Sequence, residues 1–353
     1  MTNFPTGVPP VELPRRLLRS VEKPARYVGG EWNQVRKDNR DGALTRFAFC
    51  FPDVYEIGMS HLGLRILYGL LNDREDTACE RAFAPWPDMA EALRREGIPL
   101  FSLESRTPLS AFDFVGFTLQ YEMSYTNVLL MLRLAGIPLS AAERGLRDPL
   151  VIGGGPCAVN PEPMADCFDL LVLGEGEEVL GELLDLYGAW RRAGRGAFQA
   201  VLSDGTPVSG EGREGFLLAA ARIPGIYVPA FYDVDYLPDG RVASVRPNRP
   251  GVPERVLRRV VAHLDRAPLP TRDLVPNLEV VHDRVFLELF RGCTRGCRFC
   301  QAGFIYRPVR SRSPGALAAG AREALAATGC GELALLSLST SDYPALEPLA
   351  DTL

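Results

Sequence analysis

The chain is organised around one stretch near its end, Val285-Phe-Leu-Glu-Leu-Phe-Arg-Gly-Cys293-Thr-Arg-Gly-Cys297-Arg-Phe-Cys300-Gln-Ala-Gly303. The apolar run at 285–290 predicts a β-strand, and the glycine-containing loop after it carries three cysteines in a C-x3-C-x2-C spacing. Three thiolates this close together can bind one metal centre. A structural zinc site usually has four protein ligands, whereas three ligands leave one coordination position open for chemistry. The alternatives, a zinc knuckle or a ferredoxin-like electron carrier, need a fourth cysteine, and only Cys330 follows downstream.

This pattern, with Phe299 directly before the last cysteine, resembles the signature of the radical SAM superfamily. The resemblance implies that Cys293, Cys297 and Cys300 hold a 4Fe-4S cluster, whose free iron binds the amino and carboxylate groups of S-adenosylmethionine (SAM). It also implies that Phe299 belongs to the cofactor site and that an electron donor of flavodoxin or ferredoxin type reduces the cluster. Electron transfer from the cluster then cleaves SAM and releases a 5'-deoxyadenosyl radical.

A hydroxyl-rich segment follows the next predicted strand. The pattern predicts a helix at 314–328 and a strand at 332–337, after which come Ser339, Thr340 and Ser341. In radical SAM barrels, the end of the second strand helps to hold the methionine amino group, often through a Gly-Gly-Glu-like segment. The resemblance therefore implies that these hydroxyls contact SAM. The alternative is a solvated turn at the end of the strand.

The composition indicates a folded protein with two globular domains. The chain has 353 residues, of which 46% are hydrophobic and 24% charged, as is typical of globular proteins. The first ten residues are polar and proline-rich, and no run is long and apolar enough for a signal peptide or a membrane span. We therefore expect a cytoplasmic protein without membrane partners, in which the scattered cysteines outside the motif stay reduced. The net charge of −5 argues against general binding to polyanions.

Predicted strands alternate with predicted helices from Thr45 onward. This order indicates a Rossmann-like α/β domain with a parallel sheet, in which ligands bind beyond the carboxyl ends of the strands. We predict strands at 46–51, 97–102, 112–118, 149–152 and 170–173, and helices at 62–71, 88–96, 127–134 and 178–192.

The loops after these strands resemble those of cobalamin-binding domains, which carry Asp-x-His-x-x-Gly, then Ser-x-Leu, then Gly-Gly. In place of the histidine that ligates cobalt in that family, this chain has Tyr55, and a phenol with a pKa of about 10 is a poor substitute. His61 is an alternative axial ligand, although a histidine at a helix start is more often a cap or a packing residue. The positions that the resemblance assigns to cobalamin are Asp53, Tyr55, Gly58, Thr118, Gly153, Gly154 and Gly155.

The chain divides into four predicted regions. An N-terminal arm at 1–42 precedes the cobalamin-binding-like Rossmann domain at 43–200, and a linker with a β-hairpin at 201–283 leads to the start of a radical SAM (β/α) barrel at 284–353. We also predict short basic helices, one in the arm at 14–21 and one in the linker at 253–261. A complete barrel needs on the order of 200 residues. We therefore expect the barrel to be truncated and the protein to continue beyond Leu353.

The segment around the cysteines is unusually basic. No acidic residue occurs between Leu289 and Arg322. Arginines at this density favour binding of a phosphorylated substrate or RNA, or else they neutralise an anionic cluster or pair with acids elsewhere in the fold. The arginines are Arg291, Arg295, Arg298, Arg307, Arg310 and Arg312.

The order of the domains resembles the cobalamin-dependent radical SAM class. The phrases Pro52-Asp-Val-Tyr-Glu-Ile-Gly-Met-Ser-His-Leu-Gly63, Gly153-Gly-Gly-Pro-Cys157 and Ser337-Leu-Ser-Thr-Ser-Asp-Tyr343 are similar to a bacterial family, the B12-binding domain/radical SAM proteins, whose substrate is unassigned. The implied function is a radical enzyme in which a bound corrinoid transfers a methyl group or assists otherwise. One alternative is an RNA-modifying methylthiotransferase, which needs further cluster cysteines in the N-terminal domain. Another is a cobalamin or redox sensor without turnover.

Overall fold

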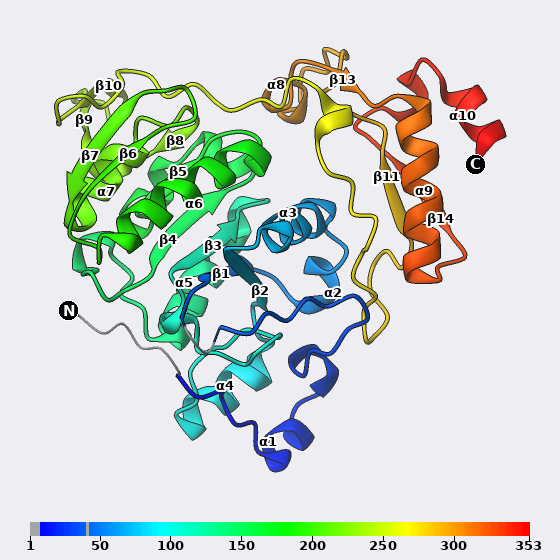
Figure 1. Ribbon diagram of the computed structural model, residues 1–353, viewed down its shortest axis with the longest axis horizontal. Coiled ribbons are helices and arrows are strands. Elements are labelled where there is room, and N and C mark those ends of the chain that lie inside the picture. Colours follow the sequence, from blue (N-terminus) through cyan, green and yellow to red (C-terminus); the bar gives the residue numbers. More distant parts are fainter. Residues whose placement is uncertain (1–7, 40–41) are drawn as a thin grey trace.

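A six-stranded sheet forms the centre of the computed structural model, which describes residues 8–39 and 42–353 (Figure 1). Its strands lie in the order β2-β1-β3-β4-β5-β8, and all neighbours pair in parallel except β5 and β8. The predicted α/β domain with a parallel sheet is therefore confirmed. The strands are β1 (Thr45–Phe51), β2 (Thr77–Phe83), β3 (Phe114–Thr118), β4 (Leu150–Gly154), β5 (Leu170–Val172) and β8 (Ile226–Tyr227).

Helices connect these strands, as the alternating pattern predicts. They are α2 (Tyr55–Gly58), α3 (Leu62–Asp73), α4 (Pro87–Glu96), α5 (Tyr125–Ala135) and α6 (Gly176–Arg192). The predicted basic helix in the arm is α1 (Arg15–Ser20), while residues 1–7 and 40–41 of the arm lie outside the described residues. In the part of the chain that the structure describes, no helix has the length and apolar character needed to span a membrane.

The second strand of the sheet is not the predicted one. Residues 97–102 form an irregular segment with a single bridge between Phe101 and Pro108, and β2 comes earlier in the chain, at Thr77–Phe83. The sequence of β2 contains the charged pair Glu80-Arg81, which interrupts an apolar pattern. Both charges are buried and paired: Arg81 lies 2.6 Å from Glu104 and 2.9 Å from Glu31, and Glu80 lies 3.3 Å from Arg46.

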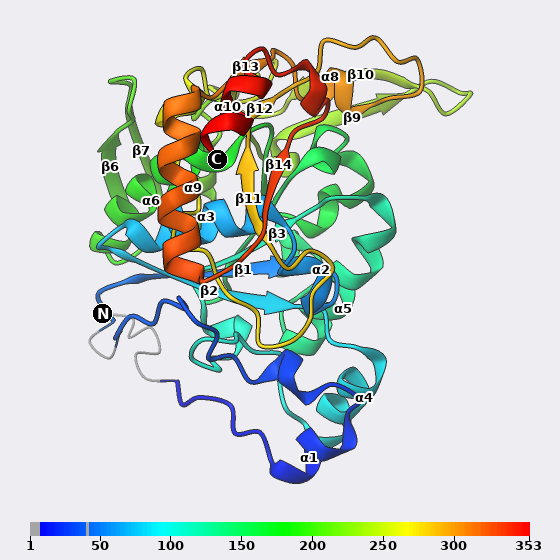
Figure 2. The ribbon, with the colours of Figure 1, turned by 90° about the vertical axis from the view of Figure 1, so that its right-hand side faces the viewer.

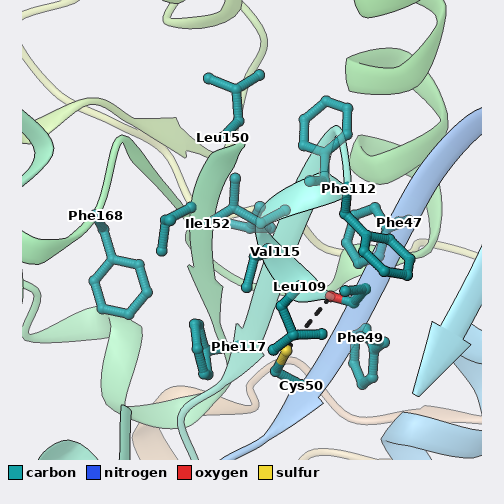
Figure 3. Close-up of a cluster of buried hydrophobic side chains, with 14 of the residues drawn as sticks. Phe47, Phe49, Cys50, Leu109, Phe112, Val115, Phe117, Leu150, Ile152 and Phe168 are labelled. Atoms are coloured by element: carbon teal, nitrogen blue, oxygen red, sulfur yellow. Dashed lines mark hydrogen bonds between the residues drawn. The ribbon is translucent and has the colours of Figure 1, made fainter. Parts of the chain in front are cut away.

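Aromatic side chains fill the core of the sheet domain (Figure 3). Phe47 and Phe49 project from the same face of β1 because side chains two residues apart share a face of a strand, and their rings lie 6.2 Å apart. Phe47 also stacks on Phe114 of the neighbouring β3, with ring centroids 5.7 Å apart. This packing fixes the register between the strands whose carboxyl ends carry the predicted ligand loops.

Residues 197–280 contribute to the same core. The hairpin of β6 (Ala197–Val201) and β7 (Pro207–Glu211) and helix α7 (Gly212–Ala220) pack beside α6, and Phe216 stacks on Trp190 with ring centroids 4.7 Å apart. The predicted hairpin in the linker is formed by β9 (Tyr232–Tyr236) and β10 (Val242–Pro247). The helix predicted at 253–261 is wrong: this segment is extended, because the Arg259 backbone bonds to Leu173 and Glu175.

The C-terminal unit is a strand-helix-strand arrangement beside α3 (Figure 2). β11 (Val285–Glu288) pairs in parallel with β14 (Leu333–Leu336), and α9 (Pro314–Thr328) connects them. Leu287 packs toward Leu317 of α9, whereas Phe286 faces the other way and packs on α3. Short elements complete the unit: β12 (Phe290–Arg291), α8 (Ala302–Ile305), β13 (Arg310–Ser311) and α10 (Leu346–Thr352).

Candidate functional site

A cavity of about 410 Å³ lies where the sheet domain meets the C-terminal unit. Its floor is one face of the sheet, because the parallel register places Phe49, Gly116 and Ile152 on the same side. Helices α3 and α6 form its sides, and residues from β12 and β14 close it. The strand order 2-1-3-4-5 places the switch point of the sheet between β1 and β3, where ligands of such folds bind.

Gly154, the last residue of β4, and Gly155, which follows it, are glycines for different structural reasons. Gly154 lines the cavity, and a Cβ there would approach no protein atom more closely than the 3.8 Å to Val172. Gly155 has a φ of +96°, and a Cβ there would lie 2.8 Å from the Leu119 carbonyl oxygen. Gly155 is therefore required by the turn, whereas Gly154 leaves open space in the cavity. Gly153 and Thr118, two other residues predicted to bind cobalamin, also line this cavity.

His61 lies at the cavity as the N-cap of α3. Its Nδ1 accepts a hydrogen bond of 3.1 Å from the Leu64 backbone N–H, and the Gln120 side chain is a second partner. Burial lowers the pKa of His61 to about 4, so the ring is neutral at pH 7. In a neutral imidazole that accepts a hydrogen bond at Nδ1, the other nitrogen carries the proton, so no lone pair of the His61 ring is free for cobalt.

We expect His61 to make the stability of the protein depend on pH. The unfolded histidine has a pKa of about 6.5, whereas the folded one has a pKa of about 4. Unfolding therefore takes up a proton in this range, and stability falls as the pH drops from 6.5 toward 4. His61→Asn retains a capping side chain but does not titrate there. Thermal unfolding at several pH values should show a smaller loss of stability in the variant, and equal losses would contradict a buried neutral His61.

The three positions that correspond to the Asp-x-His-x-x-Gly motif, Asp53, Tyr55 and Gly58, do not line the cavity. Tyr55 is buried, its hydroxyl accepts a hydrogen bond from the Asn277 N–H at 3.2 Å, and burial raises the pKa of its phenol. Gly58 packs against Phe83, whose ring would be 2.3 Å from an added Cβ. Asp53 accepts hydrogen bonds from the Tyr121 hydroxyl and the Val54 N–H. The structure thus gives Tyr55 and Gly58 packing roles.

The three cysteines of the motif lie on one irregular loop after β12. Cys293 is buried, Cys300 is half-buried and Cys297 is exposed. The Cys300 N–H donates to the Cys297 carbonyl oxygen at 3.1 Å, and the Arg295 N–H lies 3.4 Å from the Cys293 sulfur. Phe299 is 92% exposed, so its ring is available to a ligand or to another part of the protein.

An ion pair joins this loop to the hydroxyl-rich segment after β14. Arg295 Nε donates to Asp342 Oδ2 at 2.8 Å, and the Ser339 hydroxyl donates to the same oxygen at 2.7 Å. The hydrogen bond to Asp342 raises the pKa of Arg295, and the nearby Cys293 and Cys297 add to this effect. The Thr340 hydroxyl bonds to Ser337, which lines the cavity. The structure therefore brings the two predicted SAM-site segments together.

The donor set of the loop fits an iron-sulfur cluster. Its three thiols come from eight consecutive residues, and two residues separate Cys297 from Cys300. Arg295 supplies positive charge beside Cys293 and Cys297. Within residues 8–39 and 42–353, no three His, Cys, Asp or Glu side chains are already arranged as a metal site. Cys293, Cys297 and Cys300 remain the ligands that the sequence predicts, because thiol donors suit an iron-sulfur cluster.

The arginines around the cysteines are mostly paired within the protein. Arg291 lies 2.6 Å from Glu177, Arg310 lies 2.7 Å from Glu175, and Arg312 lies 3.1 Å from Glu288. The Arg307 guanidinium lies over the Phe304 ring, 5.3 Å from its centroid. Pairing with acidic residues elsewhere in the fold, one of the alternatives from the sequence, thus accounts for most of these arginines. The density of arginines is therefore a weaker argument for phosphate or RNA binding.

The four cysteines of the sheet domain are buried or half-buried. Cys50 and Cys79 are fully buried, and burial raises the pKa of both thiols. Burial also raises the pKa of Cys157 and Cys167. These four cysteines lie on four different segments of the sheet domain, without the close spacing of the motif cysteines.

Comparisons with known proteins place the chain near one family. Residues 63–229 match a family model described as the N-terminal part of radical SAM proteins. The chain is also similar to an uncharacterized protein of Methanocaldococcus jannaschii, with 23% identity over 314 residues that cover 88% of this chain and 53% of that relative. It thus spans about half the length of the curated relative it matches. No solved structure matches the chain. The family match supports a relation of this chain to radical SAM proteins.

Proposed function

We propose that this protein is a radical SAM enzyme in which Cys293, Cys297 and Cys300 hold a 4Fe-4S cluster. The observation that carries this proposal is that the cysteine loop begins at a cavity whose opposite wall comes from residues 63–229, the part matched by the family model. The match ends before the cysteine loop, so the motif and the family model support the proposal independently. A bound cluster supplies the electron that cleaves SAM.

The residues of this chain bind and orient the reactants in the proposed site. The loop at 293–300 presents the thiolates, and the ion pair of Arg295 with Asp342 holds this loop against the segment after β14. Ser339 and Thr340 lie in this segment, and their hydroxyl oxygens, although already bonded to Asp342 and Ser337, can still accept a hydrogen bond from the amino group of SAM. Exposed Phe299 adds an apolar surface. A flavodoxin- or ferredoxin-type protein is the proposed electron donor.

We propose cobalamin as a second cofactor, held in the cavity. The cavity of about 410 Å³ is too small for a whole corrinoid and would hold only part of it, and Thr118, Gly153 and Gly154 line it at the carboxyl edge of the sheet. Apolar side chains such as Phe49 and Ile152 suit the flat face of a large organic cofactor. The structural positions of Tyr55 and His61 do not fit an axial ligand, so the proposal assigns no protein ligand to cobalt. A corrinoid supplies methyl-transfer chemistry when bound, and the substrate stays unassigned.

The runner-up functions have less support. A methylthiotransferase needs a second set of cluster ligands, and Cys50 and Cys79 are buried thiols in the sheet. A redox or cobalamin sensor uses the same site without turnover, so only a measurement of turnover separates it from an enzyme.

The test of the proposed function is SAM cleavage. The full-length protein is reconstituted with iron and sulfide under anaerobic conditions, reduced, and incubated with SAM. We expect 5'-deoxyadenosine to accumulate above the level of a protein-free control, because radical SAM enzymes cleave SAM when reduced. A protein that binds its cluster, accepts an electron and yet forms no 5'-deoxyadenosine would be a sensor instead.

A further inference from the structure

A buried ion-pair network joins the sheet domain to the strand before the cysteine loop. Arg291 of β12 lies 2.6 Å from Glu177 of α6, 2.8 Å from Glu288 of β11 and 3.7 Å from Glu175. Glu175 in turn lies 2.7 Å from Arg310. Glu175, the N-cap residue of α6, and Glu177, in its first turn, therefore contact the C-terminal unit directly, although more than 100 residues separate them from Arg291.

The backbone between Arg291 and Cys293, the first predicted cluster ligand, is short and packed. Only Gly292 separates Arg291 from Cys293. Gly292 has a φ of +88°, and an added Cβ would lie 2.6 Å from the Pro308 carbonyl oxygen. The backbone at Gly292 is thus packed against the 306–308 segment, and Cys293 is itself buried. Arg291 and Cys293 thus lie on one backbone segment that this packing holds in place.

The network is buried and contains equal numbers of positive and negative side chains. Each side chain is at most 12% exposed. Screening is weak in such surroundings, so the loss of one carboxylate leaves a positive charge that acts on nearby groups. The carboxylates are Glu175, Glu177 and Glu288, and the guanidinium groups are those of Arg291, Arg310 and Arg312.

We infer that Glu177 and Glu175 are positioning residues for the metal centre. They hold Arg291 and thereby place Cys293, and their negative charge offsets that of Arg291 beside the cluster. This inference rests on the proposed function and adds that the sheet domain supplies part of the cluster's surroundings. Outer residues that hold metal ligands commonly affect metal affinity by about 10- to 100-fold.

The test compares Glu177→Gln with wild type in the full-length protein. Glutamine keeps the size and one acceptor oxygen but removes the charge. We expect the cluster's midpoint potential, measured by an EPR-monitored redox titration, to become more positive, because the added positive charge stabilises the more negative, reduced cluster. We also expect weaker retention of iron, by about 10-fold. Before reconstitution, hydrogen exchange of the backbone at 292–300 should be faster in the variant.

The matched control is Glu182→Gln on the same helix. Glu182 pairs with Arg259 of the linker at 2.6 Å and makes the same kind of ion pair without contacting β12. We expect the control to keep the wild-type potential, iron retention and exchange at 292–300. If Glu177→Gln does not fold, Glu175→Gln is tested in its place. One oxygen of Glu175 accepts no hydrogen bond within the described residues, so this substitution disturbs fewer contacts.

The outcomes separate the inference from the proposed function. Wild-type values in Glu177→Gln, or equal changes in Glu182→Gln, overturn the positioning role while leaving the radical SAM proposal intact. A wild-type protein that binds no cluster overturns the proposed function. In that case faster exchange at 292–300 in Glu177→Gln alone still supports positioning of the loop, and unchanged exchange refutes it.

Discussion

Single replacement of Cys293, Cys297 or Cys300 by alanine is expected to abolish both cluster binding and SAM cleavage. Each thiolate supplies one of three protein ligands, and a cluster held by two thiolates is exposed to loss of iron. We therefore expect each variant, after anaerobic reconstitution, to show no EPR signal of a reduced 4Fe-4S cluster. Its 5'-deoxyadenosine production should fall to that of the protein-free control.

Cys330→Ala is the matched control for these variants. Cys330 is half-buried, lies in the same C-terminal unit after α9, and is the remaining cysteine that a four-ligand site would use. We expect Cys330→Ala to retain the iron content and the activity of the wild type. Loss of the cluster in this variant would instead indicate a closed four-cysteine site, and retention of the cluster in Cys297→Ala would refute the assigned ligands.

Gly154→Leu is expected to block corrinoid binding without unfolding the protein. Gly154 lines the cavity, and its surroundings leave ordinary contact distance for a Cβ, the nearest being 3.8 Å to Val172. A leucine side chain would occupy space that the cofactor needs, and such overpacking costs about 1–3 kcal/mol. We therefore expect corrinoid affinity to fall by about 10- to 100-fold. Equilibrium titration followed by visible absorbance measures this change.

Gly69→Leu is the control for added bulk. Gly69 lies on α3, a helix that also lines the cavity, but an added Cβ there has no neighbour within 4 Å. We expect this variant to bind corrinoid as the wild type does and to unfold at a similar temperature. Undiminished corrinoid binding by folded Gly154→Leu would show that the cofactor lies elsewhere. Absence of binding by the wild type would remove cobalamin from the proposed function.

Local signals in the sequence predict several elements closely. The helix expected at 314–328 is α9 with the same bounds, because Ser313 caps its N-terminus and accepts a hydrogen bond from the Ala316 N–H. Pro314 at the first turn and Gly329 in the left-handed conformation mark its two ends. Each of these signals acts within a few residues, so the sequence contains it in full.

Other elements depend on partners that are distant in the chain. Strand β2 was missed because Glu80 and Arg81 look like surface charges, and only the fold brings Glu31 and Glu104 to Arg81. The segment at 253–261 has a helical pattern, yet its backbone bonds to the end of β5, with Arg259 donating to the Leu173 carbonyl oxygen at 2.7 Å. Tertiary hydrogen bonds therefore override a weak local preference in this segment.

The sequence alone determined the spacing of Cys293, Cys297 and Cys300 and the alternation of strands and helices. Both are properties of short stretches, since ligand spacing and apolar periodicity are read along the chain. Only the tertiary structure decided that the first turn of α6 contacts β12, the strand before the cysteine loop, through Glu177 and Arg291. It also decided that Gly154 faces a cavity while Tyr55 lies in the core. The physical reason is that the burial and charge environment of a side chain depend on residues far away in sequence, which fold against it.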